Sequence, residues 1–469
     1  MERQIVIVGG GASGALLATQ LLRQGAERPA TVTLVESSAQ LGLGLAYGTT
    51  DAIHRLNVPA GRMSALPDDP GHFLRWARQG DAAVGEWSYL PRTAYGRYLQ
   101  DVLGEELTRA QGRAGGTRLH LAFGTAERTT TVDASRGIGL LHLEDGRCLP
   151  YDHLVLATGH AGPSPLPTTV GTDDGTLGEG IINDPWAPGA LSRAARLARD
   201  GDGPIVLVGT GLTMVDVALT LTRLAPGTAL TALSRHGLAP QPHPHERRPR
   251  KVEPLRFDEP VTARSLLRTV REAVEKAMAE GDDWTGAVDD LRLITTRLWQ
   301  SLDLLEQRRF LRHVGRRWDV VRHRMAPEVG DEIARLEITG ALALRAARVH
   351  EVRPVASGLE VVIRHAGEDR VLRAAAAINC TGPCSDVARG GTPFLRHLVD
   401  VGIATPHPLG LGVAVDDRGA LIGADGRPSP AVHTLGPLRR GHLFESTAMP
   451  EIRVQAADLA AELLAGAST

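Results

Sequence analysis

The sequence has little of several features that mark other classes of protein. It contains 3 cysteines in 469 residues, too few for a disulfide framework and typical of a reducing compartment. Its formal net charge is −2, so the positive excess expected of a nucleic-acid-binding protein is missing. No apolar run reaches the length of a membrane span, and no leader precedes the first predicted strand. We therefore expect a cytoplasmic protein without nucleic-acid or membrane partners.

The histidines are also uninformative as metal ligands, because the 17 of them show no ligand spacing. We expect no metal. The length predicts two or three domains, at about 150 residues per domain. What the sequence does contain is a pair of similar segments, "QIVIVGGGASGALLATQLL" and "GPIVLVGTGLTMVDVALTL", each an apolar strand followed by a glycine turn and a helix.

The first glycine turn has the spacing G-x-G-x-x-G, at Gly9, Gly11 and Gly14, and Ser13 lies in the same turn. The first glycine makes the tight turn, the second lets a pyrophosphate approach the backbone, and the third permits close helix packing. A second predicted strand ends in Glu36, where a carboxylate would accept ribose hydroxyls. These residues predict a dinucleotide site; the alternative is a glycine turn in some other α/β protein.

The first site is expected to hold FAD. Glu36 favours FAD or NAD over NADP, because a carboxylate repels a 2′-phosphate. The position of this site at the start of the chain resembles that in flavoproteins with two dinucleotide sites, and this resemblance favours FAD.

The second turn carries Met214 where the third glycine is expected, which predicts a slightly wider helix–strand separation. The following strand ends in a hydroxyl and a guanidinium instead of an acid, the chemistry that a 2′-phosphate requires. We therefore expect NADPH here. The predicted contacts are Gly209, Gly211, Leu212, Thr213, Ser234 and Arg235. The segment "ERRPRK" at 246–251 could add to the phosphate site, and Arg235 could instead be a solvated strand-end residue.

Two further strand ends, "LATG" reaching Gly159 and "NCTG" reaching Gly382, resemble the crossing points between domains in flavoproteins with two dinucleotide sites. Over nearly its whole length the chain resembles a bacterial FAD/NAD(P)-binding protein family. The resemblance rests on the blocks "GLGLAYGT", "LNVPAGRMSALPDDPGHFLRW", "LPRTAYGRYL", "NDPWAPG", "VGTGLTMVDVALTL", "LSRHGLAP", "RHRMAPE" and "GPLRRGHLFESTAMPEIRVQA". More distantly, the layout is similar to that of flavin-dependent N-hydroxylating monooxygenases.

This resemblance implies an α/β fold with two Rossmann-like dinucleotide-binding domains and an all-α insertion. We expect a discontinuous FAD domain at 1–160 and 385–469, an NADPH domain at 161–261 and 329–384, and a helical insertion at 262–328. Gly436 is expected near the flavin phosphates or ribityl chain. The usual Gly-Asp pair there is Gly436-Pro437, so another group must satisfy the ribityl hydroxyl.

Candidates for chemistry come from the same blocks. Asn57 is the first candidate for a polar group at the reactive edge of the flavin, although asparagine also serves turns. Arg62 and Glu445 are further candidates. The helical insertion holds an arginine run, which is either a solvated face or a clamp for an anionic substrate. Its members are Arg308, Arg309, Arg312, Arg316, Arg317, Arg322 and Arg324, with Arg324 the best clamp candidate.

Cys380 and Cys384 invite a redox interpretation, but a structural role is favoured because their spacing is C-x-x-x-C and Cys380 ends an apolar strand. The sequence therefore predicts an FAD-dependent, NADPH-oxidising oxidoreductase, preferably a monooxygenase that uses molecular oxygen on a small polar substrate, amino-acid-like or anionic. The alternatives are a reductase or dehydrogenase without oxygen insertion, and a flavin-binding regulatory protein.

Overall fold

The computed structural model describes residues 2–113, 115–133, 137–168, 178–201, 203–246, 255–257, 259–356 and 358–465. The chain divides into two compact units. Unit 1 comprises Met1–Ala52, Val58–Ala161 and Cys384–Thr469, and unit 2 comprises Ile53–Asn57 and Gly162–Pro383. Within the described residues, no helix is long and apolar enough to cross a bilayer.

Unit 1 is built on a six-stranded sheet with the order β16-β17-β7-β1-β2-β3. The strands are β1 (Arg3–Val8), β2 (Ala30–Glu36), β3 (Arg118–Phe123), β7 (His153–Leu156), β16 (Ala420–Ile422) and β17 (Pro428–Thr434). All neighbours are parallel except β16 and β17. The central strands are continuous apolar runs because both faces are covered, as is usual in parallel sheets.

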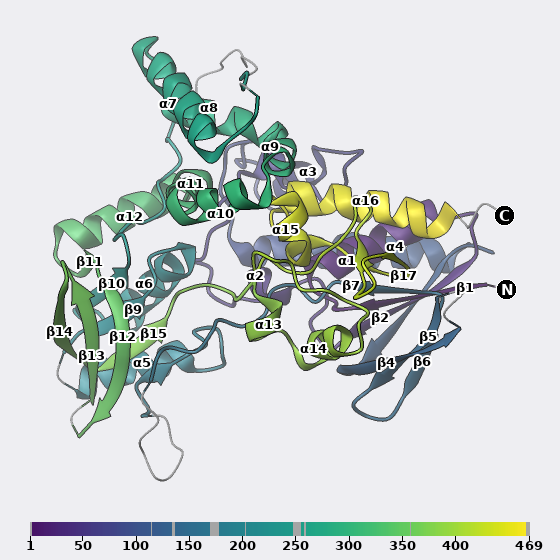
Figure 1. Ribbon diagram of the computed structural model, residues 1–469, viewed down its shortest axis with the longest axis horizontal. Coiled ribbons are helices and arrows are strands. Elements are labelled where there is room, and N and C mark those ends of the chain that lie inside the picture. Colours follow the sequence, from purple (N-terminus) through teal and green to yellow (C-terminus); the bar gives the residue numbers. More distant parts are fainter. Residues whose placement is uncertain are drawn as a thin grey trace. The chain divides into compact units, whose positions relative to one another are not determined.

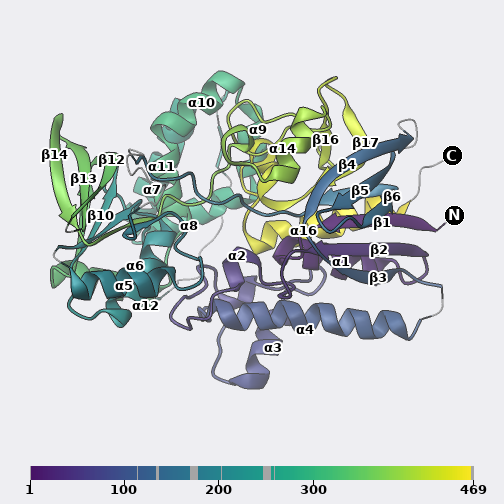
Figure 2. The ribbon, with the colours of Figure 1, turned by 90° about the horizontal axis from the view of Figure 1, so that it is seen from below.

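Helices of unit 1 pack together beside this sheet, with α16 and α4 both against α1 (Figure 1). The helices are α1 (Ala12–Gln24), α2 (Gly44–Tyr47), η1 (Ala60–Arg62), α3 (His72–Gly80), α4 (Arg92–Gln111), α13 (Val387–Gly390), α14 (Pro393–Asp400), η3 (Gly436–Arg439), α15 (Arg440–Leu443) and α16 (Met449–Ala465). A three-stranded antiparallel sheet contacts α14 and consists of β4 (Ala126–Asp133), β5 (Ile138–Leu143) and β6 (Cys148–Tyr151) (Figure 2).

Unit 2 has a parallel sheet with the order β11-β10-β9-β15-β8. Its strands are β8 (Ile181–Ile182), β9 (Ile205–Val208), β10 (Leu230–Ser234), β11 (Leu342–Ala346) and β15 (Ala376–Asn379). One apolar cluster joins this sheet to α5 (Ala190–Asp200), α6 (Leu212–Leu224) and α12 (Pro327–Ile338). A second cluster joins it to an antiparallel sheet of β12 (Arg348–Val355), β13 (Gly358–His365) and β14 (Glu368–Ala374).

The helical insertion interrupts unit 2 between β10 and β11. Its helices are α7 (Ala263–Ala279), α8 (Trp284–Asp290), η2 (Leu291–Leu293), α9 (Thr295–Ser301), α10 (Leu304–His313) and α11 (Gly315–Arg322). Side chains cap the first helical N–H groups of α7, α8 and α10, at Thr262, Asp283 and Asp303. The predicted fold class, two Rossmann-like domains with an all-α insertion, is confirmed.

Candidate functional site

The first glycine turn, between β1 and α1, has no room for side chains at two positions. Gly9 has φ +105°, and a Cβ there would overlap the carbonyl oxygen of Ala157. A Cβ on Gly14 would overlap the carbonyl oxygen of Gly9. The two glycines therefore allow β1, β7 and α1 to converge, as the spacing predicts.

Gly11 packs against the backbone of Gly44. A Cβ on Gly11 would lie 3.3 Å from the Gly44 Cα, a tight contact. Gly11 caps α1 without a side-chain hydrogen bond, and the first turn of α1 has no acidic residue. The N–H groups and positive dipole end of α1 are thus available to an anion such as a pyrophosphate.

The carboxylate of Glu36 is oriented by the backbone at the end of β2. Its Oε2 accepts a hydrogen bond from the Gly10 N–H at 2.7 Å, and its Oε1 accepts one from the Ser38 N–H at 3.0 Å. Within the described residues, no Lys, Arg or His forms an ion pair with Glu36. The carboxylate is held in place and keeps lone pairs for ribose hydroxyls.

Gly436 and Ser13, both predicted to contact the flavin, lie side by side in unit 1. Gly436 has φ +76°, and a Cβ there would lie 2.9 Å from the Ser13 Oγ. The Gly436 N–H donates to Gln455 Oε1 at 2.9 Å. The Nε2 of Gln455 is buried and has no protein acceptor among the described residues. This donor, on α16, fits a polar ligand group beside Gly436, where the usual aspartate is absent.

Gly159 follows β7 and lines an open hollow of about 430 Å³, a volume that includes space open to solvent. The hollow lies within unit 1, and its walls include the turn after β7, α14 and the Pro437–Leu438 segment. Burial, and secondarily Arg440, lowers the pKa of His160 in this wall to about 4. His160 is therefore neutral at physiological pH.

The second glycine turn, between β9 and α6, repeats the geometry of the first. Gly209 has φ +114°, and a Cβ there would overlap the carbonyl oxygen of Cys380 on the neighbouring strand end. A Cβ on Gly211 would meet nothing within 4 Å. Gly211 caps α6 without a side-chain hydrogen bond, and Leu212 and Thr213 form its half-exposed first turn. Unit 2 thus has a second uncapped helix start facing open space.

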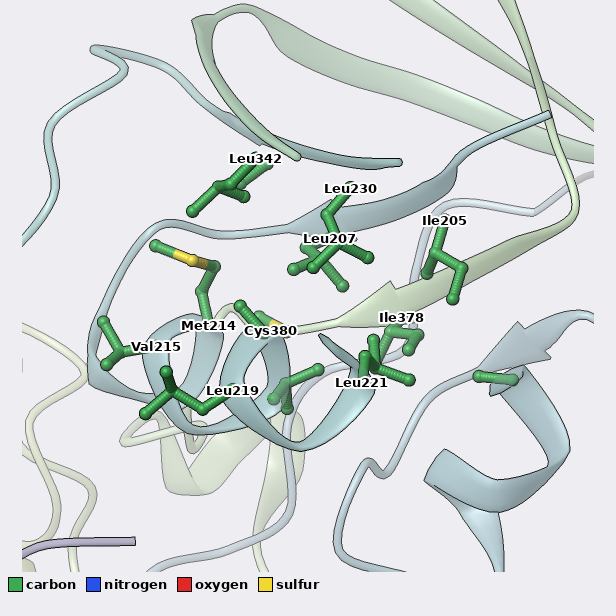
Figure 3. Packing of buried hydrophobic residues seen from close by; sticks show 14 of the residues in the cluster. Ile205, Leu207, Met214, Val215, Leu219, Leu221, Leu230, Leu342, Ile378 and Cys380 are labelled. Carbon is green, nitrogen blue, oxygen red and sulfur yellow. The ribbon is translucent and has the colours of Figure 1, made fainter. Parts of the chain in front are cut away.

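Met214, which replaces the third glycine, is completely buried. Its side chain joins the apolar cluster of unit 2, together with Leu207, Leu230 and Leu342 (Figure 3). The methionine is therefore part of the core between α6 and the sheet. The equivalent position of the first glycine turn, Gly14, has no space for a side chain, because the Gly9 carbonyl oxygen occupies it.

The strand end after the second turn differs in chemistry from Glu36. Ser234 Oγ accepts a hydrogen bond from Thr210 Oγ1 at 2.8 Å and from the Gly237 N–H at 3.0 Å. The neighbouring Arg235 is exposed, and it forms no hydrogen bond or ion pair with the described residues. Of the segment 246–251, residues 247–251 lie outside the described residues.

The candidates for chemistry are spread over both units. Asn57 belongs to unit 2, and its carbonyl oxygen lies 3.1 Å from His243 Nε2. Arg62 belongs to unit 1, where its guanidinium lies 5.4 Å from the centre of the Trp87 ring. Glu445 is buried in the segment between α15 and α16 of unit 1. The structure therefore gives no single unit in which all three side chains converge.

Arg324 has the surroundings of a structural residue, in contrast to its predicted role as a substrate clamp. Its side chain is 2% exposed and forms an ion pair with Asp289 on α8. Its guanidinium also lies 5.7 Å from the Trp284 ring centre. A guanidinium enclosed and paired in this way is not accessible to a substrate, so Arg324 joins the helices of the insertion.

The three cysteines are free. Cys380 is fully buried in unit 2, and burial strongly raises the pKa of its thiol. A reactive thiol needs the opposite, a lowered pKa and exposure. Cys384 belongs to unit 1, and its Sγ lies 3.5 Å from the Asp386 carbonyl oxygen. These surroundings fit structural cysteines.

The structure also contains residues that the sequence did not single out. Gln455 lies beside Gly436, and Thr210 hydrogen-bonds Ser234. Gln455 could have been found, because it lies in the same sequence block as Gly436, "GPLRRGHLFESTAMPEIRVQA". Nothing in the sequence links Arg316 to Thr210, although the structure brings them together across the helical insertion.

Two units that each join a parallel sheet to an uncapped helix through a glycine turn define a protein with two dinucleotide-binding domains. Residues 6–161 match the model of a family described as FAD-NAD(P)-binding. This match confirms, over these residues, the predicted resemblance to that family and the prediction of flavin and nicotinamide cofactors. No curated protein matches the sequence significantly.

Solved structures with the same fold cover almost the whole chain. The L-lysine 6-monooxygenase of Pseudomonas syringae is 16% identical, with a TM-score of 0.63 and 98% of each chain covered. The ornithine N-hydroxylase of Kutzneria sp. 744, solved with reduced FAD, NADP⁺ and L-ornithine, is 14% identical, with a TM-score of 0.60 and 99% of each covered. The bacillithiol disulfide reductase of Staphylococcus aureus is 12% identical, with a TM-score of 0.56 and 99% of each covered.

Proposed function

We propose that the protein is an FAD-dependent, NADPH-oxidising monooxygenase. The observation that carries the proposal is the difference between the two second-strand ends. Glu36, held by the Gly10 N–H, suits the ribose hydroxyls of FAD, whereas Ser234 and the exposed Arg235 suit a 2′-phosphate. One chain with both sites fits a resident flavin that is reduced by a visiting NADPH.

Each set of residues has a distinct role in this proposal. The turn from Gly9 to Gly14 and the start of α1 hold the FAD diphosphate, while Gln455, beside Gly436, donates to the ribityl chain. Gly211, with the first turn of α6, holds the NADPH diphosphate. FAD, when bound, accepts a hydride from NADPH and, once reduced, activates oxygen. Asn57, Arg62 and Glu445 stay candidates for polar groups at the reactive edge of the flavin.

The proposed substrate is a small, amino-acid-like molecule whose amino group is hydroxylated by molecular oxygen. Support comes from the lysine and ornithine hydroxylases, which share this fold over almost their whole lengths. The burial of Cys380 and the raised pKa of its thiol speak against a thiol relay within the chain, because a reactive thiol needs exposure and a lowered pKa. A cytoplasmic location is proposed from the scarcity of cysteine.

The decisive experiment follows electrons from NADPH into product. We expect the purified protein to contain FAD, and NADPH to bleach the flavin absorbance without oxygen. In air, with L-lysine, L-ornithine or L-aspartate supplied, mass spectrometry should find a hydroxylated amine in proportion to the NADPH oxidised. Reduction of a disulfide substrate without any hydroxylated product would establish the reductase alternative, and failure of NADPH to bleach the flavin would exclude both enzymes.

The variant Gly211→Ala tests the second site separately. The new Cβ has open space around it, so fold and flavin content should be preserved while the methyl group obstructs the coenzyme diphosphate. The KM for NADPH is expected to rise about tenfold or more, consistent with the loss of a charge-assisted contact. Gly104→Ala, also in open space but within α4, is the matched control and should leave the KM unchanged. Equal KM values for NADPH in the two variants would contradict the assignment of coenzyme binding to unit 2.

A further inference from the structure

The helical insertion reaches the second glycine turn through the side chain of Arg316 on α11. Its Nη2 lies within hydrogen-bond distance of the Leu238 carbonyl oxygen (2.6 Å), the Thr210 Oγ1 (3.1 Å) and the Thr210 carbonyl oxygen (3.2 Å). Thr210 is the residue between the two glycines of the turn. The insertion, which follows β10 in the chain, therefore returns to the turn that precedes α6.

Thr210 occupies in the second turn the position that Gly10 occupies in the first. The N–H of Gly10 holds the carboxylate of Glu36, the group that suits ribose hydroxyls. In unit 2 the side chain of Thr210 instead contacts Ser234 and Arg316. Ser234 is the counterpart of Glu36, and Arg316, which contacts the same Thr210 hydroxyl, brings a positive charge to this strand end.

Arg235 directly follows Ser234 and brings a second guanidinium to this strand end, where Thr210 Oγ1 contacts both Ser234 and Arg316. Burial, and secondarily the charge of Arg235, lowers the pKa of Arg316, while Asp319 on the same helix acts in the opposite direction. Arg316 is half-buried, and its Nε and Nη1 have no hydrogen-bond partner among the described residues. Two cations that converge beside free donors are stabilised when an anion binds between them.

We propose that Arg316 and Arg235 together bind the 2′-phosphate of NADPH, so that the helical insertion takes part in coenzyme selection. This inference rests on the proposed use of NADPH in unit 2. Ser234 would complete the site from the strand end, with its hydroxyl oriented by Thr210 and the Gly237 N–H. The phosphate would accept from two planar guanidinium groups, the arrangement that favours arginine over lysine.

The test measures binding of two fragments of the coenzyme, so it does not depend on turnover. Isothermal titration calorimetry of the full-length protein compares 2′,5′-ADP, which carries the 2′-phosphate, with 5′-AMP, which does not. Arg316→Met should raise the dissociation constant of 2′,5′-ADP by about 10- to 100-fold, the range for charged hydrogen bonds. The dissociation constant of 5′-AMP should stay within about twofold of the wild-type value. Arg317→Met is the matched control, because the exposed Arg317 lies next in α11 and, among the described residues, hydrogen-bonds only the His313 carbonyl oxygen.

Two further variants separate phosphate binding from support of the turn. Arg235→Met should cause the same selective loss of affinity, although Arg235 forms no hydrogen bond with the turn among the described residues. Arg316→Lys should restore part of the affinity. An equal loss of affinity for both fragments in Arg316→Met would overturn the inference and show that Arg316 only supports the glycine turn. Selective loss in a protein that never oxidises NADPH would support the inference while refuting the proposed monooxygenase.

Discussion

At the scale of single residues, the same position in two equivalent turns is occupied by glycine and by methionine for reasons of space. Gly14 faces the Gly9 carbonyl oxygen, whereas Met214 enters an apolar cluster and is completely buried. A methionine at this position therefore does not indicate a poor nucleotide site. It indicates that the helix is held by side-chain packing in unit 2 and by backbone proximity in unit 1.

Buried histidines are a second residue-scale feature, with a consequence for stability. Burial lowers the pKa of both His153 and His160 from 6.5 to about 4, assisted by His433 and Arg3 for the former and by Arg440 for the latter. The folded state therefore resists protonation that the unfolded state accepts. The stability from these groups is fully present above pH 6.5 and is lost as the pH falls towards 4.

We predict that His153→Gln flattens the decline in the free energy of unfolding between these two pH values. The difference between wild type and variant should amount to at most about 3 kcal/mol across the window. Urea unfolding at a series of pH values measures it. His120→Gln, at an exposed position of β3 without an ion pair among the described residues, is the control and should keep the wild-type slope. A slope unchanged by His153→Gln would show that this ring is accessible to protons in the folded state.

At the scale of elements, the sequence predicts the two nucleotide units well and the helical insertion only in outline. The strands before Gly9 and Gly209 are continuous apolar runs with a fixed turn chemistry, so their type and order follow from local pattern. The partners of Arg324 and Arg316 cannot be inferred from local pattern. Asp289 and Thr210 are distant from them in sequence, and only packing brings each pair together. The arginine run therefore predicted a charged face without revealing which of its members are enclosed.

Arg324 belongs to this scale, because it connects the end of α11 with α8. We predict that Arg324→Met lowers the free energy of unfolding by about 3 kcal/mol, since the variant removes the cationic partner of Asp289 and a contact with Trp284. Chemical denaturation followed by tryptophan fluorescence measures the change. Arg312→Met, at an exposed position of α10, should cost less than about 0.5 kcal/mol. Unchanged stability together with a raised KM for the amine would restore Arg324 as a substrate clamp.

At the scale of the whole molecule, each unit has its own sheet, core and glycine turn, so each cofactor should act on one unit. We predict that FAD added to apoprotein slows amide hydrogen exchange in unit 1, and that 2′,5′-ADP slows it in unit 2. At 100 times the dissociation constant, either ligand contributes about 2.7 kcal/mol to the stability of the state that binds it. Mass spectrometry of exchanged peptides locates the effect, with FMN and 5′-AMP as the matched weaker ligands. Protection by FAD confined to unit 2 would reverse the cofactor assignment.

The sheet of unit 1 also sets an order of events during synthesis. β17 pairs with β7 in parallel, yet Pro428–Thr434 emerges from the ribosome long after His153–Leu156, when the whole of unit 2 has already been made. Gly436 and Gln455 follow later still. The two parts of the proposed flavin site are therefore made on either side of unit 2 in the chain, so we expect flavin loading to await the synthesis of unit 2.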